Sequence, residues 1–289
     1  MRKSKYLVLS GLYFDFNDDL SEIKEIKSLF KNQNILDIER FNKLISIKEN
    51  QFEFYNLNFL YLPKNIEIMG KYVFLNNQIQ LLDLSNCINL KIIKFWAFRN
   101  NQIKQLKLPQ NIEIIKNVFA YNKIKLLDLS NYTKLKAIES KSFEYNQIKQ
   151  LKLPKNIEII GEFAFSENQI QILDLSNCIK LDKIEYNTFL KNQIKYFKLP
   201  TNIKEIYSEA FCSNKINVLD LSKYYELKFI GGDAFLDNPL NEIKILDDIY
   251  IYYHNKSNIW NKFAKYYNDN NKKAGDYKLE NNKWKWYPL

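Results

Sequence analysis

The sequence repeats itself with a period of about 46 residues. Leu-Pro pairs recur with spacings of 46, 45 and 46 residues, ending at Pro63, Pro109, Pro154 and Pro200. Between them stand Leu-Asp-Leu-Ser segments that begin at Leu82, Leu127, Leu173 and Leu219. Each unit therefore divides into two coils of 21 to 24 residues. A period of this length predicts a solenoid, because one such coil can bury its apolar face only against its neighbours.

A second motif, Phe-x-x-Asn, occurs once in most of these coils. Its eight copies are Phe74/Asn77, Phe98/Asn101, Phe119/Asn122, Phe143/Asn146, Phe165/Asn168, Phe189/Asn192, Phe211/Asn214 and Phe235/Asn238. Stacking would place Phe on Phe and Asn on Asn. We expect the asparagines to satisfy backbone groups at the turn that enters each strand, since an unpaired buried polar group costs about 1–3 kcal/mol.

The Leu-x-Leu segment that follows each asparagine predicts a short strand, because leucines two apart point to the same side of a strand. Alignment gives ten coils, starting at Leu36, Leu60, Leu82, Leu106, Leu127, Leu151, Leu173, Phe197, Leu219 and Ile243. The wider apolar spacing after each strand suits a turn and an irregular or short helical return. The predicted fold is therefore an α/β-type repeat solenoid, spanning roughly 45–50 Å at ~4.8 Å per coil.

These motifs resemble those of the BspA-like leucine-rich-repeat proteins, whose coils contain Leu-x-x-[Ile/Leu]-x-[Ile/Leu]-Pro and Ile-x-x-x-Ala-Phe. The second motif matches at Ala97-Phe98, Ala164-Phe165, Ala210-Phe211 and Ala234-Phe235. The resemblance covers residues 35–246, with Leu-Asp-Leu-Ser in alternate coils and Asn where the family often has Cys. It implies a right-handed leucine-rich-repeat solenoid with a concave parallel sheet, used for binding and often found at cell surfaces. It does not identify a ligand.

Both ends of such a solenoid need a cover for the exposed core. Residues 1–34 are the predicted N-terminal cap, residues 35–246 the solenoid and residues 247–289 the C-terminal cap. In the first cap, residues 6–16 suit an edge strand. Helical spacing follows at Leu20, Ile23, Ile26, Leu29 and Phe30.

The C-terminal cap is predicted to be a helix followed by a hairpin. The apolar positions of an amphipathic helix are Ile259, Trp260, Phe263 and Tyr267. A two-residue turn at Asn281-Asn282 would pair Tyr277 with Trp286, and Leu279 with Trp284.

This C-terminal segment also has an alternative interpretation. Residues 250–289 contain eleven aromatic residues, eight lysines and three acidic residues, and so carry half of the chain's net charge of +10. Interleaved rings and lysines can stack on bases and contact phosphates. The alternative function is therefore the binding of nucleic acid or another anionic polymer by this tail. A cap explains the same composition, so nucleic acid is not the expected partner.

Two positions in each predicted strand point away from the core. The position after the first Leu of Leu-x-Leu holds Asp37, Tyr61, Asp83, Lys107, Asp128, Lys152, Asp174, Lys198, Asp220 and Lys244. From Asp83 onward the sign alternates, which avoids like charges ~5 Å apart in a parallel stack. The position before that Leu holds mostly apolar residues. Such a strip either marks a binding site or shields the lysine stems and the sheet backbone.

On the first interpretation, a partner contacts the outward side chains of the sheet. The expected contact residues are Tyr61, Leu126, Ile172, Tyr196, Lys107, Asp128, Lys152, Asp174 and Lys198. The expected partner is a protein, such as a host or surface protein, or a surface glycan. The chain itself is expected to be a monomer.

Catalysis is not expected. His254 is the only histidine, which argues against imidazole metal sites and against triads that need a histidine base. Candidate carboxylates such as Asp128 and Asp174 recur with the repeat and have lysine neighbours. No cofactor and no metal site are predicted.

The three cysteines do not form a disulfide framework. Cys87 and Cys178 occupy equivalent positions four coils apart, about 19 Å, which is beyond disulfide reach. We expect them to be small buried or half-buried fillers at the position where Tyr132 and Tyr224 stand in other coils.

The sequence and the family resemblance favour different cellular compartments for this protein. Residues 1–16 resemble a signal peptide in their basic start and apolar run, but Asp15 interrupts the run and a small-residue cleavage site is lacking. No stretch approaches the ~20 apolar residues of a transmembrane helix. The sequence therefore favours the cytoplasm, whereas the family resemblance favours the cell surface or secretion.

Overall fold

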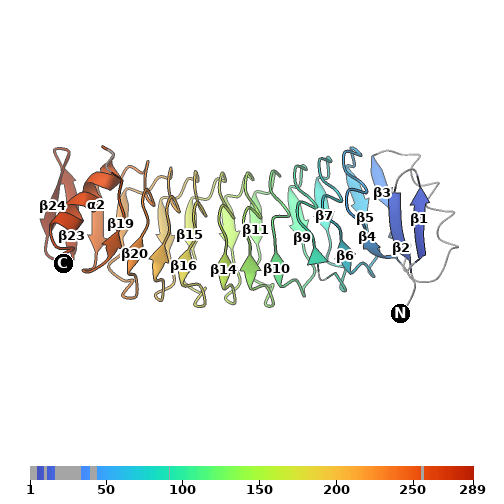
Figure 1. Ribbon diagram of the computed structural model, residues 1–289, viewed down its shortest axis with the longest axis horizontal. Coiled ribbons are helices and arrows are strands. Elements are labelled where there is room, and N and C mark those ends of the chain that lie inside the picture. Colours follow the sequence, from blue (N-terminus) through green and yellow to red (C-terminus); the bar gives the residue numbers. More distant parts are fainter. Residues whose placement is uncertain (1–4, 10–11, 17–33, 40–43, 91, 255–256) are drawn as a thin grey trace.

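The computed structural model describes residues 5–9, 12–16, 34–39, 44–90, 92–254 and 257–289 (Figure 1). Coils stack along one long axis into a parallel solenoid, with a helix and a hairpin at the C-terminal end. Each coil contributes one strand to each of two β-faces that enclose the core. The helical spacing predicted between Leu20 and Phe30 lies outside the described residues.

All ten predicted leucine strands form. They are β3 (Ile35–Asp37), β5 (Phe59–Tyr61), β7 (Leu81–Asp83), β9 (Gln105–Lys107), β11 (Leu126–Asp128), β13 (Gln150–Lys152), β15 (Ile172–Asp174), β17 (Tyr196–Lys198), β19 (Val218–Asp220) and β21 (Glu242–Ile245). In β11 the central Leu127 is buried and both neighbours are exposed, as strand alternation requires. The predicted solenoid and its parallel register are confirmed.

The leucine strands do not form one continuous sheet. They pair as β3-β5, β7-β9, β11-β13, β15-β17 and β19-β21, so the hydrogen-bonded ladder is interrupted after every second coil. Within a ladder, the Leu129 N–H donates to the Lys152 carbonyl oxygen at 2.8 Å. At a gap, the Leu108 N–H donates instead to the Tyr132 hydroxyl at 3.0 Å. The next residue, Pro109, has no N–H to donate.

The return segments contain a second set of strands. These are β4 (Leu44–Ile47), β6 (Ile68–Met69), β8 (Ile92–Ile93), β10 (Ile114–Ile115), β12 (Ala137–Ile138), β14 (Ile159–Ile160), β16 (Lys183–Ile184), β18 (Glu205–Ile206), β20 (Phe229–Ile230) and β22 (Tyr250–Ile251). The expectation of an irregular or short helical return missed them, although isoleucine pairs suit strands. They form three runs, β4-β6-β8, β10-β12-β14 and β16-β18-β20-β22.

A column of phenylalanine rings fills the core between the two sets of strands. Neighbouring rings from Phe52 to Phe235 lie 5.2–5.9 Å apart. Phe143, for example, is completely buried. Phe52 is a ninth member that the motif missed, because Tyr55 stands in place of the asparagine.

Each core phenylalanine lies between two residues in the left-handed backbone region. Around Phe143 these are Lys141 (φ 59°) and Tyr145 (φ 52°), and all nine coils place non-glycine residues there. This conformation costs about 1–2 kcal/mol per residue. Hydrogen bonds to the next coil offset this cost. The Lys141 N–H donates to the carbonyl oxygen of Glu162 at 2.9 Å, and the Tyr145 N–H donates to that of Ser166 at 3.0 Å.

The asparagine column ties each coil to the one before it. Asn146 Nδ2 donates to the Phe119 carbonyl at 2.9 Å, and Asn146 Oδ1 accepts from the Ile124 N–H at 3.1 Å. The same two contacts recur for all eight asparagines of the motif. The predicted role in satisfying turn groups is confirmed, since Asn146 Nδ2 also lies 3.3 Å from the Phe143 carbonyl of its own turn, but the shorter bonds reach the preceding coil.

The N-terminal strands β1 (Lys5–Leu9) and β2 (Leu12–Phe16) form an antiparallel hairpin that pairs with β4. At the other end, α2 (Ile259–Asp269) precedes β23 (Gly275–Glu280) and β24 (Lys283–Tyr287). β23 pairs antiparallel with β21, and the hairpin register is the predicted one. Trp260 of α2 lies 5.1 Å from Phe235, the last ring of the column.

The cysteines are buried and unbridged. Cys87 and Cys178 lie with Sγ 3.8 Å from the carbonyl oxygens of Pro63 and Pro154. In the alternate units this position holds the tyrosines, whose hydroxyls accept from backbone N–H groups at 3.0 Å. The predicted filler role is confirmed. Desolvation raises the pKa of both thiols to about 11.

Candidate functional site

The outward side of the leucine strands presents two parallel columns of side chains, which we call the ladder face. It consists of the first and third residues of β3, β5, β7, β9, β11, β13, β15, β17 and β19 and the matching Glu242 and Lys244 of β21. All nine predicted contact residues lie on this face and are exposed. The central ones belong to β9, β11, β13, β15 and β17, whereas Tyr61 lies on β5, near the N-terminal end.

The first column is apolar over much of its length. Leu126, Ile172 and Tyr196 are exposed by 64%, 66% and 69%. Ile172 and Tyr196 are register partners in one ladder, so their side chains form a continuous apolar patch. Gln150 separates this patch from Leu126.

The second column carries charges of alternating sign. Lys107 Nζ lies 3.0 Å from Asp83, and Lys152 Nζ lies 3.2 Å from Asp128. Both pairs join the two strands of one ladder. At the C-terminal end, Lys244 pairs instead with Glu242 at 3.3 Å. Exposed pairs of this kind add only about 0–1 kcal/mol each, so their main effect is to fix the register.

Each aspartate of the Leu-Asp-Leu-Ser motif also accepts hydrogen bonds from the serine of the motif, a role that the sequence analysis did not predict. Asp128 Oδ1 accepts hydrogen bonds from the Ser130 hydroxyl at 2.6 Å and the Ser130 N–H at 3.0 Å. The contact recurs at Asp83, Asp174 and Asp220. These bonds hold the pKa of Asp128 below its ordinary value, and Lys152 lowers it further. The serine thus closes the turn after the strand.

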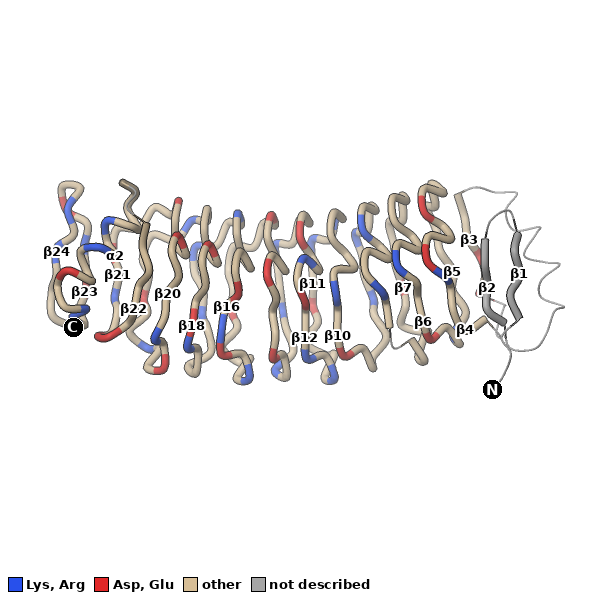
Figure 2. The backbone as a smooth tube through the Cα atoms, in the orientation of Figure 1, with Lys and Arg blue, Asp and Glu red and all other residues tan. Residues whose placement is uncertain are grey.

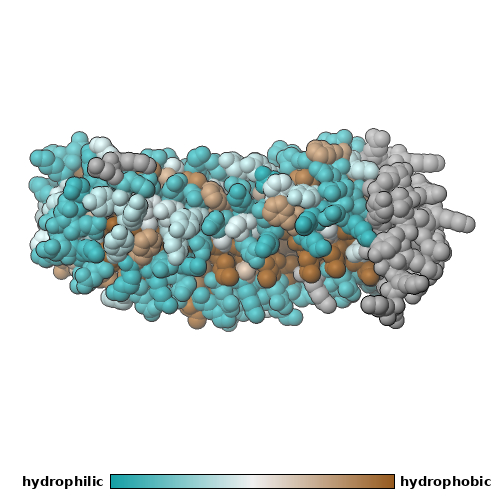
Figure 3. All heavy atoms as spheres, in the orientation of Figure 1, coloured by the Kyte–Doolittle hydropathy of each residue, from teal (hydrophilic) through white to brown (hydrophobic). Residues whose placement is uncertain are grey.

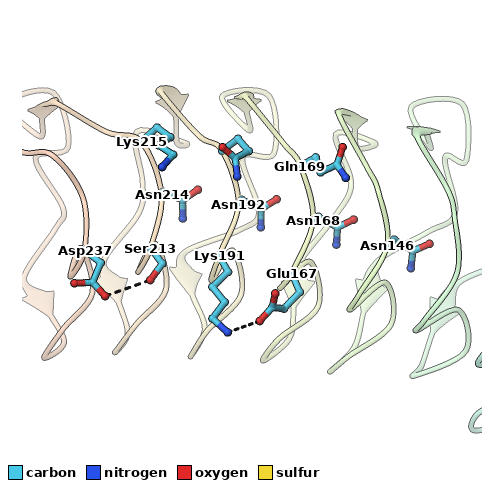
Figure 4. Close-up of a pocket in the computed structure, with 11 residues that line it drawn as sticks. Asn146, Glu167, Asn168, Gln169, Lys191, Asn192, Ser213, Asn214, Lys215 and Asp237 are labelled. Carbon is cyan, nitrogen blue, oxygen red and sulfur yellow. Dashed lines mark hydrogen bonds and ion pairs between the residues drawn. The ribbon is translucent and has the colours of Figure 1, made fainter.

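A shallow polar groove of about 440 Å³ runs over the asparagine column (Figure 4). On one rim, Lys191 lies 2.6 Å from Glu167, and Ser213 lies 3.4 Å from Asp237. Its floor consists of asparagines such as Asn192, whose amide groups already bond to the backbone. The groove therefore offers a ligand mainly its rim side chains, and it is a weaker candidate than the ladder face.

The C-terminal aromatic residues are largely used in packing. Trp260, Phe263, Tyr267, Tyr277 and Trp284 are buried. Trp286 is partly buried, its Nε1 donates to the Ala274 carbonyl, and Lys273 lies over its ring. Tyr250, Tyr252 and Tyr287 remain exposed, so only part of this aromatic content is available for stacking on bases. Basic and acidic residues both occur along the whole length of the described stack (Figure 2).

His254 lies beside the C-terminal helix. Its Nε2 is 3.7 Å from Asp233, and its backbone N–H donates to Asn261 at 2.8 Å. Within the described ranges, no three His, Cys, Asp or Glu side chains gather in a way that could hold a metal ion. The described helix is also too short and too polar to cross a bilayer.

The chain matches the family model described as the BspA type leucine rich repeat region over residues 21–145 and 136–258. Among solved structures, it is similar to a leucine-rich repeat protein from Bacteroides ovatus, with 14% identity and a TM-score of 0.43. That match covers 88% of this chain and 66% of the other, so this chain spans slightly less than two thirds of it. A leucine rich cell surface protein from Faecalibacterium prausnitzii gives 12% identity, a TM-score of 0.33 and coverage of 88% and 96%. No curated protein matches the sequence.

Proposed function

Because this chain belongs to the BspA-type leucine-rich repeat family, we propose that it is a non-enzymatic scaffold that binds another protein through its ladder face. The supporting observation is the exposed patch formed by Ile172 and Tyr196 beside the charged column. Apolar side chains placed next to charges of both signs are typical of protein interfaces, in which a central anchor is surrounded by a polar rim.

The rigidity of the face favours this use. Every coil is held to the next by backbone bonds, by the Phe column and by the asparagine bridges. A surface ordered before binding loses little conformational freedom on binding, so more of the contact energy appears as affinity. The charged column would then set the register of the partner, while Tyr196 and Ile172 supply most of the binding energy.

The test starts with an affinity capture that compares the intact protein with the double variant Ile172→Ser/Tyr196→Ser. Neither side chain belongs to the core, so the variant should fold normally. The matched control is Ile179→Ser, which removes an equally exposed isoleucine (70%) outside the ladder face. A partner retained by the control and lost by the double variant supports the proposal.

Calorimetric titration of that purified partner then measures the effect. The double variant should weaken binding by about 2 kcal/mol or more, which corresponds to roughly 30-fold. Unchanged affinity would move the site away from the ladder face. Capture that survives protease treatment of the partner preparation but not glycan cleavage would identify a glycan ligand instead.

A further inference from the structure

The second set of strands carries an exposed apolar strip of its own. Ile68, Ile92, Ile114, Ala137 and Ile159 occupy the outward position in five consecutive coils, and we call them the isoleucine strip. Figure 3 shows apolar side chains gathered in a band over this part of the stack. The four isoleucines are 36–51% exposed. A contiguous apolar patch of this kind is typical of an interaction surface.

The surface of the isoleucine strip is uneven, with protruding side chains and hollows between them. Ile114 and Ile159 are about half exposed, whereas Ala137 between them is only 6% exposed and forms a dip. On the other side of Ile114, a hollow of about 850 Å³ opens where β8 and β10 are not paired. Its lining combines Ile92, Ile114 and Phe95 with lysines.

Charges beside the strip change sign at its centre. On the edge that follows the strands, three successive coils carry Lys71, Lys94 and Lys116, and the next three carry Glu139, Glu162 and Glu185. The two halves meet at an ion pair between Lys116 and Glu139, 2.7 Å long. On the edge that precedes the strands, the central order is the reverse, with Glu113 followed by Lys136.

We propose that the isoleucine strip is the interface of a homodimer in which two copies run antiparallel, related by a two-fold axis between β10 and β12. This axis sets Lys94 against Glu162 of the second copy. It also sets Glu113 against Lys136 of the second copy. Each contact occurs twice, as an isologous interface requires. This proposal differs from the monomer expected from the sequence.

The same axis satisfies the shape of the strip. It places Ile114 of each copy over the dip at Ala137 of the other, and Ile92 opposite Ile159. Interdigitation of this kind is what close packing at an interface core demands. The contact spans six coils, about 24 Å, which is at the small end for a specific interface, so the dimer should be concentration-dependent.

Other occupants fit less well. A partner or membrane surface of one charge sign would be repelled by either the lysine half or the glutamate half of the strip. Two copies with their coils in the same order would set Glu158 against Glu162 of the second copy. They would also set Asp182 against Glu185. The antiparallel pairing matches opposite signs along the whole edge that follows the strands and at the centre of the edge that precedes them, and its one like-charged pair, Glu67 against Asp182 of the second copy, lies at the ends of the contact.

The experiment is a charge exchange read by sedimentation equilibrium over a wide range of protein concentrations. The first variant, Lys94→Glu/Lys116→Glu, makes both halves acidic at this edge. The second, Glu139→Lys/Glu162→Lys, makes both halves basic. Each variant alone should lose at least tenfold in dimer affinity, because its own halves then repel. An equimolar mixture should form a heterodimer, because the acidic halves of one face the basic halves of the other.

The control is Lys152→Glu/Lys198→Glu, which makes on the ladder face the same change in net charge as the first variant and should leave the dimer intact. Circular dichroism melts establish that all variants are folded. Three results would overturn the proposal: a wild-type protein that stays monomeric at every concentration, dimers that survive in both charge variants, or folded variants whose mixture fails to associate. The ladder face is not part of this contact, so the outcome is independent of the proposed function.

Discussion

Asn146 completes the turn of the coil that precedes its own, because its Nδ2 lies 2.9 Å from the carbonyl oxygen of Phe119. The second contact, from the Ile124 N–H to Asn146 Oδ1, fixes the same amide from its other side. Two backbone groups of one coil thus depend on a side chain supplied by the next coil.

Replacing Asn146 with Ala should therefore lower the free energy of unfolding by about 1–3 kcal/mol, because the buried Ile124 N–H loses its partner and the Phe119 carbonyl keeps only its bond from Asn122. Urea denaturation measures the loss. The control is Asn131→Ala, at an exposed turn, where a change within about 0.5 kcal/mol is expected. Equal losses in the two variants would show that the bridge contributes nothing specific.

The Phe143→Ala variant should lose about 3–5 kcal/mol, because the ring is fully buried between Phe119 at 5.5 Å and Phe165 at 5.7 Å. Phe143→Leu refills part of the cavity and should lose less. Chemical denaturation of both variants checks the order. A leucine variant as unstable as the alanine variant would indicate that ring stacking, rather than cavity volume, dominates.

Deletion of residues 247–289 should cause aggregation, because it uncovers Phe235 and leaves β21 as an unpaired apolar edge. Size-exclusion chromatography and dye binding to exposed apolar surface follow the change. The point variant Trp260→Ala should destabilise the same end without removing the hairpin. A truncated protein that stays soluble and equally stable would mark the tail as a separate module and would revive its binding of an anionic polymer.

Stability should fall in acid. The pKa values of Asp128 and Asp174 lie below the ordinary 3.8 in the folded protein, because each carboxylate accepts hydrogen bonds from a serine. The unfolded chain therefore takes up these protons first as the pH falls. The resulting stabilisation is complete well above pH 3.8 and is lost as the pH falls through the folded pKa values.

The double variant Ser130→Ala/Ser176→Ala tests this origin. It should be less stable near neutral pH and should lose less on acidification, as measured by urea denaturation at pH 7, 5 and 3. A variant with the wild-type slope between pH 5 and 3 would assign the acid sensitivity to other carboxylates.

The thiols should be unreactive in the folded protein. Burial raises the pKa of Cys87 and Cys178 to about 11 and also raises that of Cys212, so little thiolate exists near neutral pH. A thiol-specific reagent at pH 8 should therefore react slowly with the native protein, and with all three cysteines after unfolding in urea. Rapid labelling of the native protein would contradict the described burial.

Local spacing was enough to predict much of this fold. The 46-residue period identified the solenoid, and the Leu-x-Leu positions gave the strands with their register, such as Leu127 opposite Leu151. The hairpin partners Tyr277 and Trp286 followed from the two-residue turn. In each case the spacing of the residues follows directly from the geometry of the backbone, so the spacing alone is enough to predict the structure.

The features that escaped prediction depend on contacts between coils. The left-handed backbone at residues such as Lys141 could not be predicted, because no glycine stands there. Hydrogen bonds to the next coil hold these residues in that conformation. The strand pair Ile114–Ile115 is too short to show alternation. On the ladder face, the outward positions were predicted correctly. The missed bond from Ser130 to Asp128 is an exception to this rule, because it is local, and the Asp-x-Ser spacing of the motif is the signal that could have predicted it.

The direction of the asparagine bridges gives the molecule a polarity that bears on its synthesis. The chain leaves the ribosome N-terminus first, so each new coil emerges with one turn N–H unpaired and with the carbonyl of its phenylalanine bonded only to the asparagine of its own turn. The N–H finds its partner, and the carbonyl gains its shorter bond, only when the asparagine of the following coil arrives, some 19 to 27 residues later. Folding during translation would therefore advance one coil behind the nascent end, and a stalled chain would always expose one unfinished turn at its growing tip.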